Sequence, residues 1–444
     1  MKSYPKYKDS GIAWIGEMPE HWERKKLKYI SNTQPSNVDK KSKENESEVL
    51  LCNYVDVYKN DFITDRIAFM KATASEQQIE RFKLREGDVL VTKDSEDPKD
   101  IAIPALVMND YDNVVCGYHL TRIRPFEELA GDYIFRVFQA KPFNTFFETN
   151  AKGVTRYGLG TEVFLNFEIT HPPLPEQTQI ARFLDRKTTQ IDAALDQHRQ
   201  LLQLLREERA ALINEAVTKG IDPEVAMKDS GVEWIGEVPG HWEVTAYKRI
   251  TTRVVVGIAE AATGAYSDNG TPILRATNVK DGKIRGSLKF INEELVLKNQ
   301  SKTLRLNDIL TVRTGYPGKS AVITEAFDGA QCFTMLISSL KSGQSSEFFN
   351  YLLNSSTGEA YFDLTAWGSA QKNISVPILQ EMSIAIPPIN EQHQIVQHIE
   401  ARTTRIDREI AATEKEIALL EEYRQALIAE AVTGKIDVRD YPLD

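Results

Sequence analysis

The chain has 444 residues and a formal net charge of −10, and 41% of its residues are hydrophobic. This length predicts two or three domains, and the hydrophobic content excludes a disordered chain. The acidic balance argues against a protein that coats nucleic acid without regard to sequence, because that affinity comes mainly from neutralised phosphates.

Localisation and cysteine chemistry are limited by simple patterns. No apolar run approaches the roughly 20 residues of a membrane span, and the first residues lack the apolar stretch of a signal peptide. We therefore expect a cytoplasmic protein with no membrane partner. Cys52, Cys116 and Cys332 lack the spacing of metal ligands, so we expect small core residues and no metal site.

The first element in the chain is a motif that occurs twice. KDSGIAWIGEMPEHWE (8–23) returns as KDSGVEWIGEVPGHWE (228–243), with twelve of sixteen positions identical at an offset of 220. The motif contains a histidine in each copy, but no serine, cysteine or carboxylate constellation accompanies it. Packing of His21 and His241 beside Trp22 and Trp242 is therefore favoured over catalysis.

Between the matched blocks the two copies diverge, and both middle regions have the pattern of mixed α/β domains. Short β-rich runs punctuated by Gly, Asn and Asp predict strands. These runs are EVLLCNYVDVY, GDVLVTK and NVVCGYHLTRI in the first region, and TPILRATNV, NDILTVR and FTMLISSL in the second. Helical stretches, GDYIFRVFQAKPFNTFFE and SSEFFNYLLNSSTGEAYFDL, follow in the same order.

Two short segments still align between the middle regions. LREGDVLVTK (84–93) aligns with LRLNDILTVR (304–313), and KGVTRYGLG (152–160) aligns with WGSAQKNIS (367–375). TGYPGKS (314–320) ends like a phosphate-binding loop, but Arg313 stands where that motif needs its first glycine, so a tight turn after a strand is favoured. The sequence has no Asn-Pro-Pro-Tyr or Asp-Pro-Pro-Tyr stretch and no cofactor-binding glycine loop, and we expect no catalytic residues.

Each copy closes with a stretch that predicts a long helix. PPLPEQTQIARFLDRKTTQIDAAL (172–195) returns as PPINEQHQIVQHIEARTTRIDREI (387–410) with ten identities in 24, at an offset of 215. LINEAVTKGID (212–222) returns as LIAEAVTGKID (427–437) with eight identities in 11. The expected start and end signals are Pro175, Glu176 and Gln177 in the first helix, Asn390 as a cap of the second, and Gly220 and Gly434 at the two ends.

Apolar residues in these helices recur every seven positions and predict a coiled-coil seam. The seam residues are Leu184, Ile191, Leu195, Leu202, Leu205 and Leu212 in the first helix, and Ile399, Ile406, Ile410, Ile417, Leu420 and Leu427 in the second. We expect the two helices to pair antiparallel about a pseudo-twofold axis. The alternative is that each helix packs only on its own domain.

The predicted fold class is α+β: two mixed α/β domains are joined by two long helices that form an antiparallel coiled coil, with an internal pseudo-twofold repeat. The expected boundaries are a first globular domain at 1–173, a central helix at 174–220, a second globular domain at 221–388, and a C-terminal helix and tail at 389–444.

The combination of WIGEMPEHWE-like openings, PPLPEQ or PPINEQ helix starts and EAVT helix ends resembles the specificity subunit of Type I restriction-modification enzymes over nearly the whole chain. The resemblance implies two target recognition domains, each for one half of a split site in double-stranded DNA, and helices that set the gap. It implies docking of two methyltransferase subunits, no cofactor in this chain, and adenosylmethionine and ATP on the partner subunits. Whether a restriction subunit also joins stays open.

Base discrimination limits which residues can recognise such a site. Arg or Lys suits guanine, Asn or Gln suits adenine, and a carboxylate suits cytosine, on loops that reach the major groove. The aligned segments offer such residues at matched places. The candidate DNA-binding residues are Lys93, Asp94, Ser95, Lys152, Thr155, Arg156 and Tyr157 in the first domain, and Arg313, Thr314, Tyr316, Lys319, Ser369, Gln371, Lys372 and Asn373 in the second. The alternative for each is an ordinary exposed loop residue.

Two other classes of protein compete with this interpretation. A coiled-coil interaction scaffold that does not bind DNA would have no reason to vary only the interiors of its domains. A self-contained methyltransferase or nuclease would need a cofactor or metal motif, and the sequence shows neither.

Overall fold

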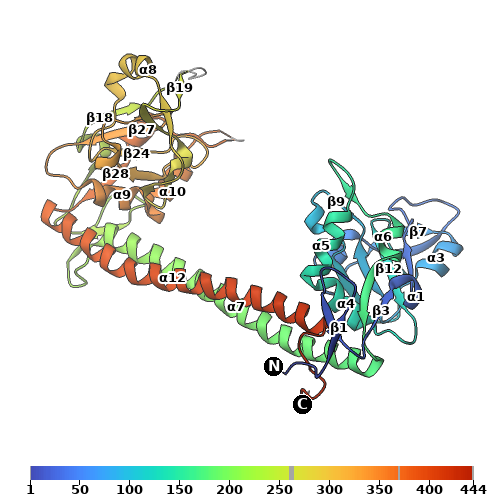
Figure 1. Ribbon diagram of the computed structural model, residues 1–444. Helices are drawn as coiled ribbons and strands as arrows, with labels where there is room; N and C mark the ends of the chain where they lie inside the picture. Colours follow the sequence, from blue (N-terminus) through green and yellow to red (C-terminus); the bar gives the residue numbers. More distant parts are fainter. Residues whose placement is uncertain (1, 260–264, 369–370, 443–444) are drawn as a thin grey trace. The chain divides into compact units, whose positions relative to one another are not determined.

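The computed structural model describes residues 2–259, 265–368 and 371–442, and it divides into two units that each contain one globular domain and parts of both long helices (Figure 1). Unit 1 consists of Met1–Arg199 and Lys415–Asp444, and unit 2 consists of Gln200–Glu414. Among the described residues, no helix is both long and apolar enough to cross a membrane.

Unit 1 opens with the repeated motif and continues into a mixed domain. The hairpin of β1 (Tyr7–Asp9) and β2 (Glu17–Pro19) is followed by β3 (Glu23–Lys26), which pairs with β14 (Glu168–His171). The main sheet has the order β4 (Ser31–Pro35), β12 (Leu120–Pro125), β8 (Val89–Thr92), β10 (Pro104–Val107) and β6 (Phe62–Ile63). A smaller sheet has the order β11 (Val114–Cys116), β5 (Ser47–Cys52) and β7 (Met70–Ala74).

The helices of unit 1 follow their apolar patterns. α4 (Gly131–Gln139) buries Tyr133, Phe135 and Phe138, and α5 (Lys141–Asn150) begins anew at the Lys-Pro pair, since proline suits a first helical turn but not an interior. The short helices are α1 (Leu27–Ile30), α2 (Tyr54–Tyr58), α3 (Glu76–Phe82) and α6 (Thr161–Leu165).

Two predicted strands in unit 1 are partly wrong. NVVCGYHLTRI forms two strands, β11 and β12, with a turn between them. EVLLCNYVDVY forms a strand only up to Cys52, and Tyr54–Tyr58 forms helix α2. The Asp56 carboxylate accepts a hydrogen bond from the backbone N–H of Asn53 at 2.7 Å. This helix-start contact outweighs the β propensity of the valines and tyrosines.

Unit 2 repeats this plan within its described residues. The hairpin of β15 (Met227–Asp229) and β16 (Glu237–Pro239) has the same register as its counterpart, shifted by 220, and β17 (Glu243–Ala246) pairs with β28 (Ser383–Ile386). One sheet has the order β18 (Thr251–Val256), β27 (Leu336–Leu340), β24 (Ile309–Thr311) and β25 (Ser320–Val322). A second has the order β19 (Tyr266–Ser267), β23 (Lys289–Ile291), β20 (Thr271–Leu274) and β26 (Gln331–Cys332), and β21 (Val279–Lys280) pairs with β22 (Lys283–Ile284).

In unit 2 the predicted strand TPILRATNV forms a strand only over Thr271–Leu274, and Ala276–Asn278 forms a 3-10 helix. Its helices are α8 (Glu293–Lys298), α9 (Ser346–Asn354), α10 (Ser356–Thr365) and α11 (Val376–Gln380). TGYPGKS is the tight turn between β24 and β25, closed by a hydrogen bond from the Val312 N–H to the Lys319 carbonyl at 2.7 Å. All three cysteines are unpaired and buried, as expected of small core residues.

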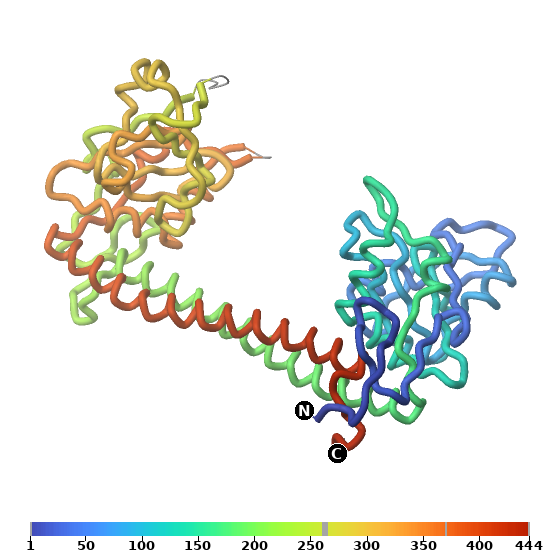
Figure 2. The backbone as a smooth tube through the Cα atoms, viewed as in Figure 1, coloured from blue at the N-terminus to red at the C-terminus, as the bar shows by residue number. Residues whose placement is uncertain are grey.

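The two long helices, α7 (Leu174–Lys219) and α12 (Ile389–Val432), form the predicted antiparallel coiled coil (Figure 2). Their direction follows from ion pairs between them. In unit 1, Arg199 contacts Glu421 at 3.0 Å. In unit 2, Arg206 contacts Glu414 at 2.8 Å and Arg209 contacts Asp407 at 2.7 Å. Numbers rise along one helix as they fall along the other, and none of the twelve seam residues is exposed.

Asn390 is not the cap of its helix, and that prediction was wrong. α12 begins at Ile389, because the Pro388 carbonyl already accepts the N–H of Gln392 at 3.0 Å. In α7, the Pro173 carbonyl accepts the N–H of Gln177 at the same distance. The second proline of each pair therefore begins the helical hydrogen bonding, and Asn390 lies within the first turn.

Candidate nucleic-acid interface

Each domain is fixed to the start of its own long helix by one glutamate. In unit 1, Glu176 accepts hydrogen bonds from the Trp22 indole at 3.1 Å and the Tyr4 hydroxyl at 2.5 Å, and its other oxygen lies 2.9 Å from Nε2 of His21. Burial and this carboxylate hold the pKa of Tyr4 well above its ordinary value, so the hydroxyl remains a donor. The histidine thus contributes a polar contact as well as packing beside the tryptophan.

Unit 2 repeats the tryptophan and histidine contacts at the expected offsets, without a counterpart of Tyr4. Glu391 accepts the Trp242 indole N–H at 3.0 Å and lies 2.7 Å from Nε2 of His241. The glutamine that follows each glutamate is buried as well, and Gln177 and Gln392 each hydrogen-bond the backbone of their own domain. The Glu-Gln pair of the repeated PEQ and NEQ motifs therefore sets how each domain joins its helix.

The glycines at the helix ends complete this framework. Gly434 has φ +74°, and a Cβ there would lie 2.3 Å from Cδ of Pro19. Gly220 has φ +78°, and a Cβ there would lie 3.4 Å from the Trp242 ring. Each helix therefore ends against the repeated motif of the other copy.

In unit 1 the two aligned segments form one edge. β9 (Asp94–Ser95) pairs antiparallel with β13 (Tyr157–Gly158), with Gly158 opposite Asp94. The Leu159 N–H donates to the Lys93 carbonyl at 2.9 Å. The backbone of Lys152 forms an isolated antiparallel β-bridge with Gly158. We call these paired segments the paired-loop edge of the unit.

Unit 2 builds its paired-loop edge with the same contacts. The backbone of Asn373 forms isolated antiparallel β-bridges with Thr314 and Trp367. The Ile374 N–H donates to the Arg313 carbonyl at 3.0 Å. Each contact matches one in unit 1 when the first segment is shifted by 220 and the second by 215. The main-chain geometry of the edge is therefore repeated, although its side chains differ.

The side chains predicted for unit 1 divide into inward and outward groups. Ser95 is buried, and the Lys93 ammonium donates to the Ser36 carbonyl at 3.0 Å while lying 4.5 Å from the Tyr118 ring centroid. Burial lowers the pKa of Lys93. Tyr157 is half-buried, whereas the outward side chains are Lys152, Thr155 and Arg156.

The most organised cation of this edge is Arg156. Its guanidinium donates to the Asp94 carboxylate at 2.5 and 2.9 Å, and Nδ1 of His119 lies 2.8 Å from the same carboxylate. Asp94 is 16% exposed at its side chain and Arg156 is 52% exposed, so the carboxylate orients a guanidinium that is about half exposed. An arginine oriented in this way can donate two hydrogen bonds to guanine.

The predicted residues of unit 2 also lie together, except for Ser369, which falls outside the described residues. The Arg313 guanidinium donates to the Asn373 side chain and to the Ile374 carbonyl, each at 3.2 Å. Lys372 pairs with Asp363 at 2.5 Å, and Lys319 pairs with Glu359. Gln371 is exposed, Thr314 is half-buried, and Tyr316 is 74% exposed.

Several neighbours of these edges were not predicted. Tyr118 and His119 reach the edge of unit 1 from the turn before β12, and Tyr54 donates to Ser95 at 3.3 Å while stacking on Tyr58. In unit 2, Trp367 is 57% exposed. The glycine in NVVCGYHLTRI could have indicated a turn at Tyr118 and His119. The sequence alone does not indicate that this turn lies at the edge.

Two mixed domains with one shared framework, and matched edges that carry different side chains, define a duplicated recognition protein. Residues 19–203 and 259–422 match the family model of the Type I restriction modification DNA specificity domain, and the chain belongs to this family. It is a specificity subunit with a role in DNA sequence recognition, and the scaffold alternative is not favoured.

Characterised relatives agree over most of the chain. The Type I restriction enzyme MjaVIII specificity subunit of Methanocaldococcus jannaschii is 23% identical over 95% of each chain. The EcoBI specificity subunit of Escherichia coli is 23% identical over 65% of this chain and 62% of its own. The HsdS subunit of Thermoanaerobacter tengcongensis has a TM-score of 0.50 at 17% identity, covering 94% of this chain and 98% of its own. A chain from a type I R-M system solved for its complex assembly and conformational transition has a TM-score of 0.66 at 16% identity, covering 94% and 99%. These two structures share the fold.

Proposed function

We propose that each globular domain recognises one half of a bipartite DNA site through its paired-loop edge. The observation that carries this proposal is the repetition of the same main-chain contacts in both edges, with different side chains placed on them. Such an edge presents a fixed backbone on which sequence preference can change independently in the two domains. Shared framework and independent edges suit two unlike half-sites.

The side chains suggest what each edge distinguishes. In unit 1, Arg156 held by Asp94 suits guanine, since a planar guanidinium matches two acceptors in the major groove. In unit 2, exposed Gln371 suits adenine, and Arg313 and Lys372 supply cations beside it. Tyr316 offers an exposed ring to a thymine methyl group or to the DNA backbone.

The test is a methylation map of a random-sequence library, made with the chain coexpressed with its methyltransferase partner. Arg156→Ala should relax the first half-site alone, and Lys372→Ala the second alone, with a loss of about 1–3 kcal/mol of discrimination at the affected base pair. Arg408→Ala, an exposed charge change on α12, serves as the control. An unchanged motif in both edge variants contradicts the proposal.

The two long helices, in this proposal, set the gap between the half-sites. One inserted four-residue turn lengthens a helix by about 6 Å, which corresponds to one or two base pairs at roughly 3.4 Å each. We expect an insertion in either helix to change the tolerated gap by that amount while both half-sites stay the same. An unchanged gap would refute this role of the helices and would leave the proposal on base recognition unaffected.

The repeated framework supports a proposal about partners as well. Since both units present the same motif and helix ends, we infer that two methyltransferase subunits bind, one per unit, and that they supply catalysis, adenosylmethionine and ATP. This chain then acts as a non-catalytic subunit in the cytoplasm. Native mass spectrometry of the assembled complex should find two methyltransferase subunits per specificity chain, and one would contradict the inference.

A further inference from the structure

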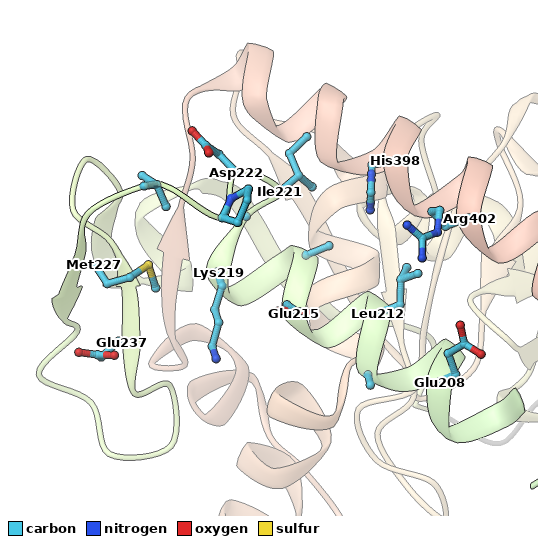
Figure 3. Close-up of a pocket in the computed structure, with 15 residues that line it drawn as sticks. Glu208, Leu212, Glu215, Lys219, Ile221, Asp222, Met227, Glu237, His398 and Arg402 are labelled. Carbon is cyan, nitrogen blue, oxygen red and sulfur yellow. The ribbon is translucent and has the colours of Figure 1, made fainter. Parts of the chain in front are cut away.

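An open hollow of about 670 Å³ lies in unit 2 beside the end of α7 (Figure 3). Leu212, Lys219 and Asp222 line it from α7 and the segment that follows. His398 and Arg402 line it from α12 and project toward α7 in Figure 3. The internal repeat allows this hollow to be compared with the same place in unit 1.

In unit 1 that place is filled by residues 438–442 of the chain's own tail. The Gln179 amide donates to the carbonyls of Val438 at 3.1 Å and Tyr441 at 2.8 Å. The Tyr441 ring packs edge-on against Phe183, with centroids 4.7 Å apart, and the Lys187 ammonium lies 5.4 Å from its centroid. A glutamine, a ring and a cation on α7 therefore hold an extended segment.

The same three positions recur on α12 at the offset of 215, as Gln394, His398 and Arg402. Gln394 is exposed, and among the described residues no group hydrogen-bonds its amide. Within the same described part of the chain, His398 and Arg402 have no hydrogen bond or ion pair. Unit 2 thus has residues equivalent to those that hold 438–442 in unit 1, but no segment is bound to them among the described residues.

The chain takes different paths after the two equivalent aspartates, Asp437 and Asp222. In unit 1 the N–H of Asp437 donates to the carbonyl of Lys2 at 2.8 Å, and the tail leaves from this point. The equivalent residue of unit 2 is Asp222, from which the chain continues into β15 instead. The chain after Asp222 lines the hollow with Pro223, Val225 and Met227 and leaves it open.

Charge indicates what would fill it. Glu208, Glu215, Asp222 and Glu237 line the hollow together with only two permanent cations, so a basic segment is favoured. In the tail of unit 1, Arg439 donates to Asp437 at 2.7 and 3.0 Å, two residues before Tyr441. The Asp222 carboxylate accepts a hydrogen bond from the Glu224 N–H at 3.0 Å and is otherwise available on the surface.

We propose that the hollow of unit 2 docks an extended segment of a partner protein in which an arginine stands two residues before an aromatic residue. Gln394 donates to the backbone carbonyls of that segment, His398 packs against the ring, and Arg402 lies over it. Asp222 pairs with the arginine. This docking does not depend on base recognition by the paired-loop edges.

The test uses the full-length chain and a fluorescent peptide of the tail sequence, VRDYPLD. Anisotropy should show saturable binding of one peptide per chain, and replacement of its tyrosine by alanine should abolish the binding. Gln394→Ala should weaken binding about 10-fold, because two hydrogen bonds to the peptide backbone are lost. Arg405→Ala on the same helix, whose side chain is 85% exposed, should leave the affinity unchanged.

A gain of affinity gives the sharper result. His398→Phe recreates the ring that unit 1 has at this place and should tighten binding several-fold, which a merely disrupted helix cannot do. Absence of saturable binding to both wild type and His398→Phe at millimolar peptide overturns the proposal. Self-association of the chain that Tyr441→Ala abolishes would assign the hollow to a second copy's tail and overturn the partner assignment. None of these variants should change the methylation motif, so failure here is distinct from failure of the proposed function.

Discussion

Replacing Glu176 with glutamine tests whether one carboxylate fixes the first domain to its helix. The carboxylate accepts three hydrogen bonds, from Tyr4, His21 and Trp22, and it is 7% exposed. A glutamine retains one acceptor oxygen and directs an amide toward the third group. Hydrogen bonds to a charged acceptor contribute about 1.5–3 kcal/mol and neutral ones about 0.5–1.5. The expected loss of unfolding free energy is therefore about 2–3 kcal/mol.

The matched variant is Glu391→Gln in unit 2. Among the described residues, Glu391 accepts from only Trp242 and His241, and its side chain is 22% exposed, so the loss should be roughly half as large. In a unit of about 230 residues, each kcal/mol lowers the melting temperature by roughly 2–4 °C. We therefore expect about 5–10 °C for the first variant and about half that for the second.

Calorimetry measures the shifts, and hydrogen exchange by segment shows where they arise. Glu176→Gln should speed exchange in residues 2–23 and leave 222–243 unchanged, and Glu391→Gln should do the reverse. Equal shifts in the two variants, or faster exchange spread over both segments, would refute the assignment of each glutamate to its own domain.

Three further outcomes are expected. Gly434→Ala should destabilise unit 1 by several kcal/mol in urea titrations, because its Cβ would lie 2.3 Å from a proline ring carbon, whereas Gly16→Ala, with φ +70° and open space, should show only the smaller cost of its backbone conformation. Burial and nearby Lys25 lower the pKa of His171 below 6.5, so the unfolded chain takes up the proton first and stability is lost as pH falls below about 6.5. His171→Ile, which copies the second unit, should reduce the difference in urea midpoint between pH 7.5 and 5.5, and an unchanged difference would contradict the shift. Burial raises the pKa of the Cys116 and Cys332 thiols to about 12, so alkylation at pH 8 should modify neither until the chain unfolds, and rapid labelling of the native chain would contradict their burial.

Periodicity made the long helices predictable, because a seven-residue spacing survives whatever surrounds it. The ends were less predictable. Gly220 and Gly434 suit helix ends in any context, since a positive φ needs glycine, but Asn390 was wrong because Pro388 already accepts the first helical hydrogen bond. The prediction of a strand at Tyr54–Tyr58 was also wrong. β propensity takes no account of a helix-start contact such as that between Asn53 and Asp56.

The candidate site was predictable only as two separate loops. Alignment of the two copies located residues 93–95 and 152–157, but nothing local in the sequence indicates that Asp94 binds the Arg156 guanidinium. His119 and Tyr118 come from a third segment, the turn before β12, and the fold places them at the edge. Pairwise contacts between distant segments depend on the register of strands, and register is set by the whole domain.

The state of the candidate cations bears on how such an edge gains specificity. Arg156, Lys319 and Lys372 are each paired with a carboxylate of the chain itself. A phosphate must compete with that carboxylate for the cation, so the pairing lowers attraction to DNA of any sequence. A guanidinium that is already held in place loses less conformational entropy when it donates two hydrogen bonds to a base. If these residues contact DNA as proposed, this pairing and the net charge of −10 both favour discrimination between sequences over general affinity for DNA.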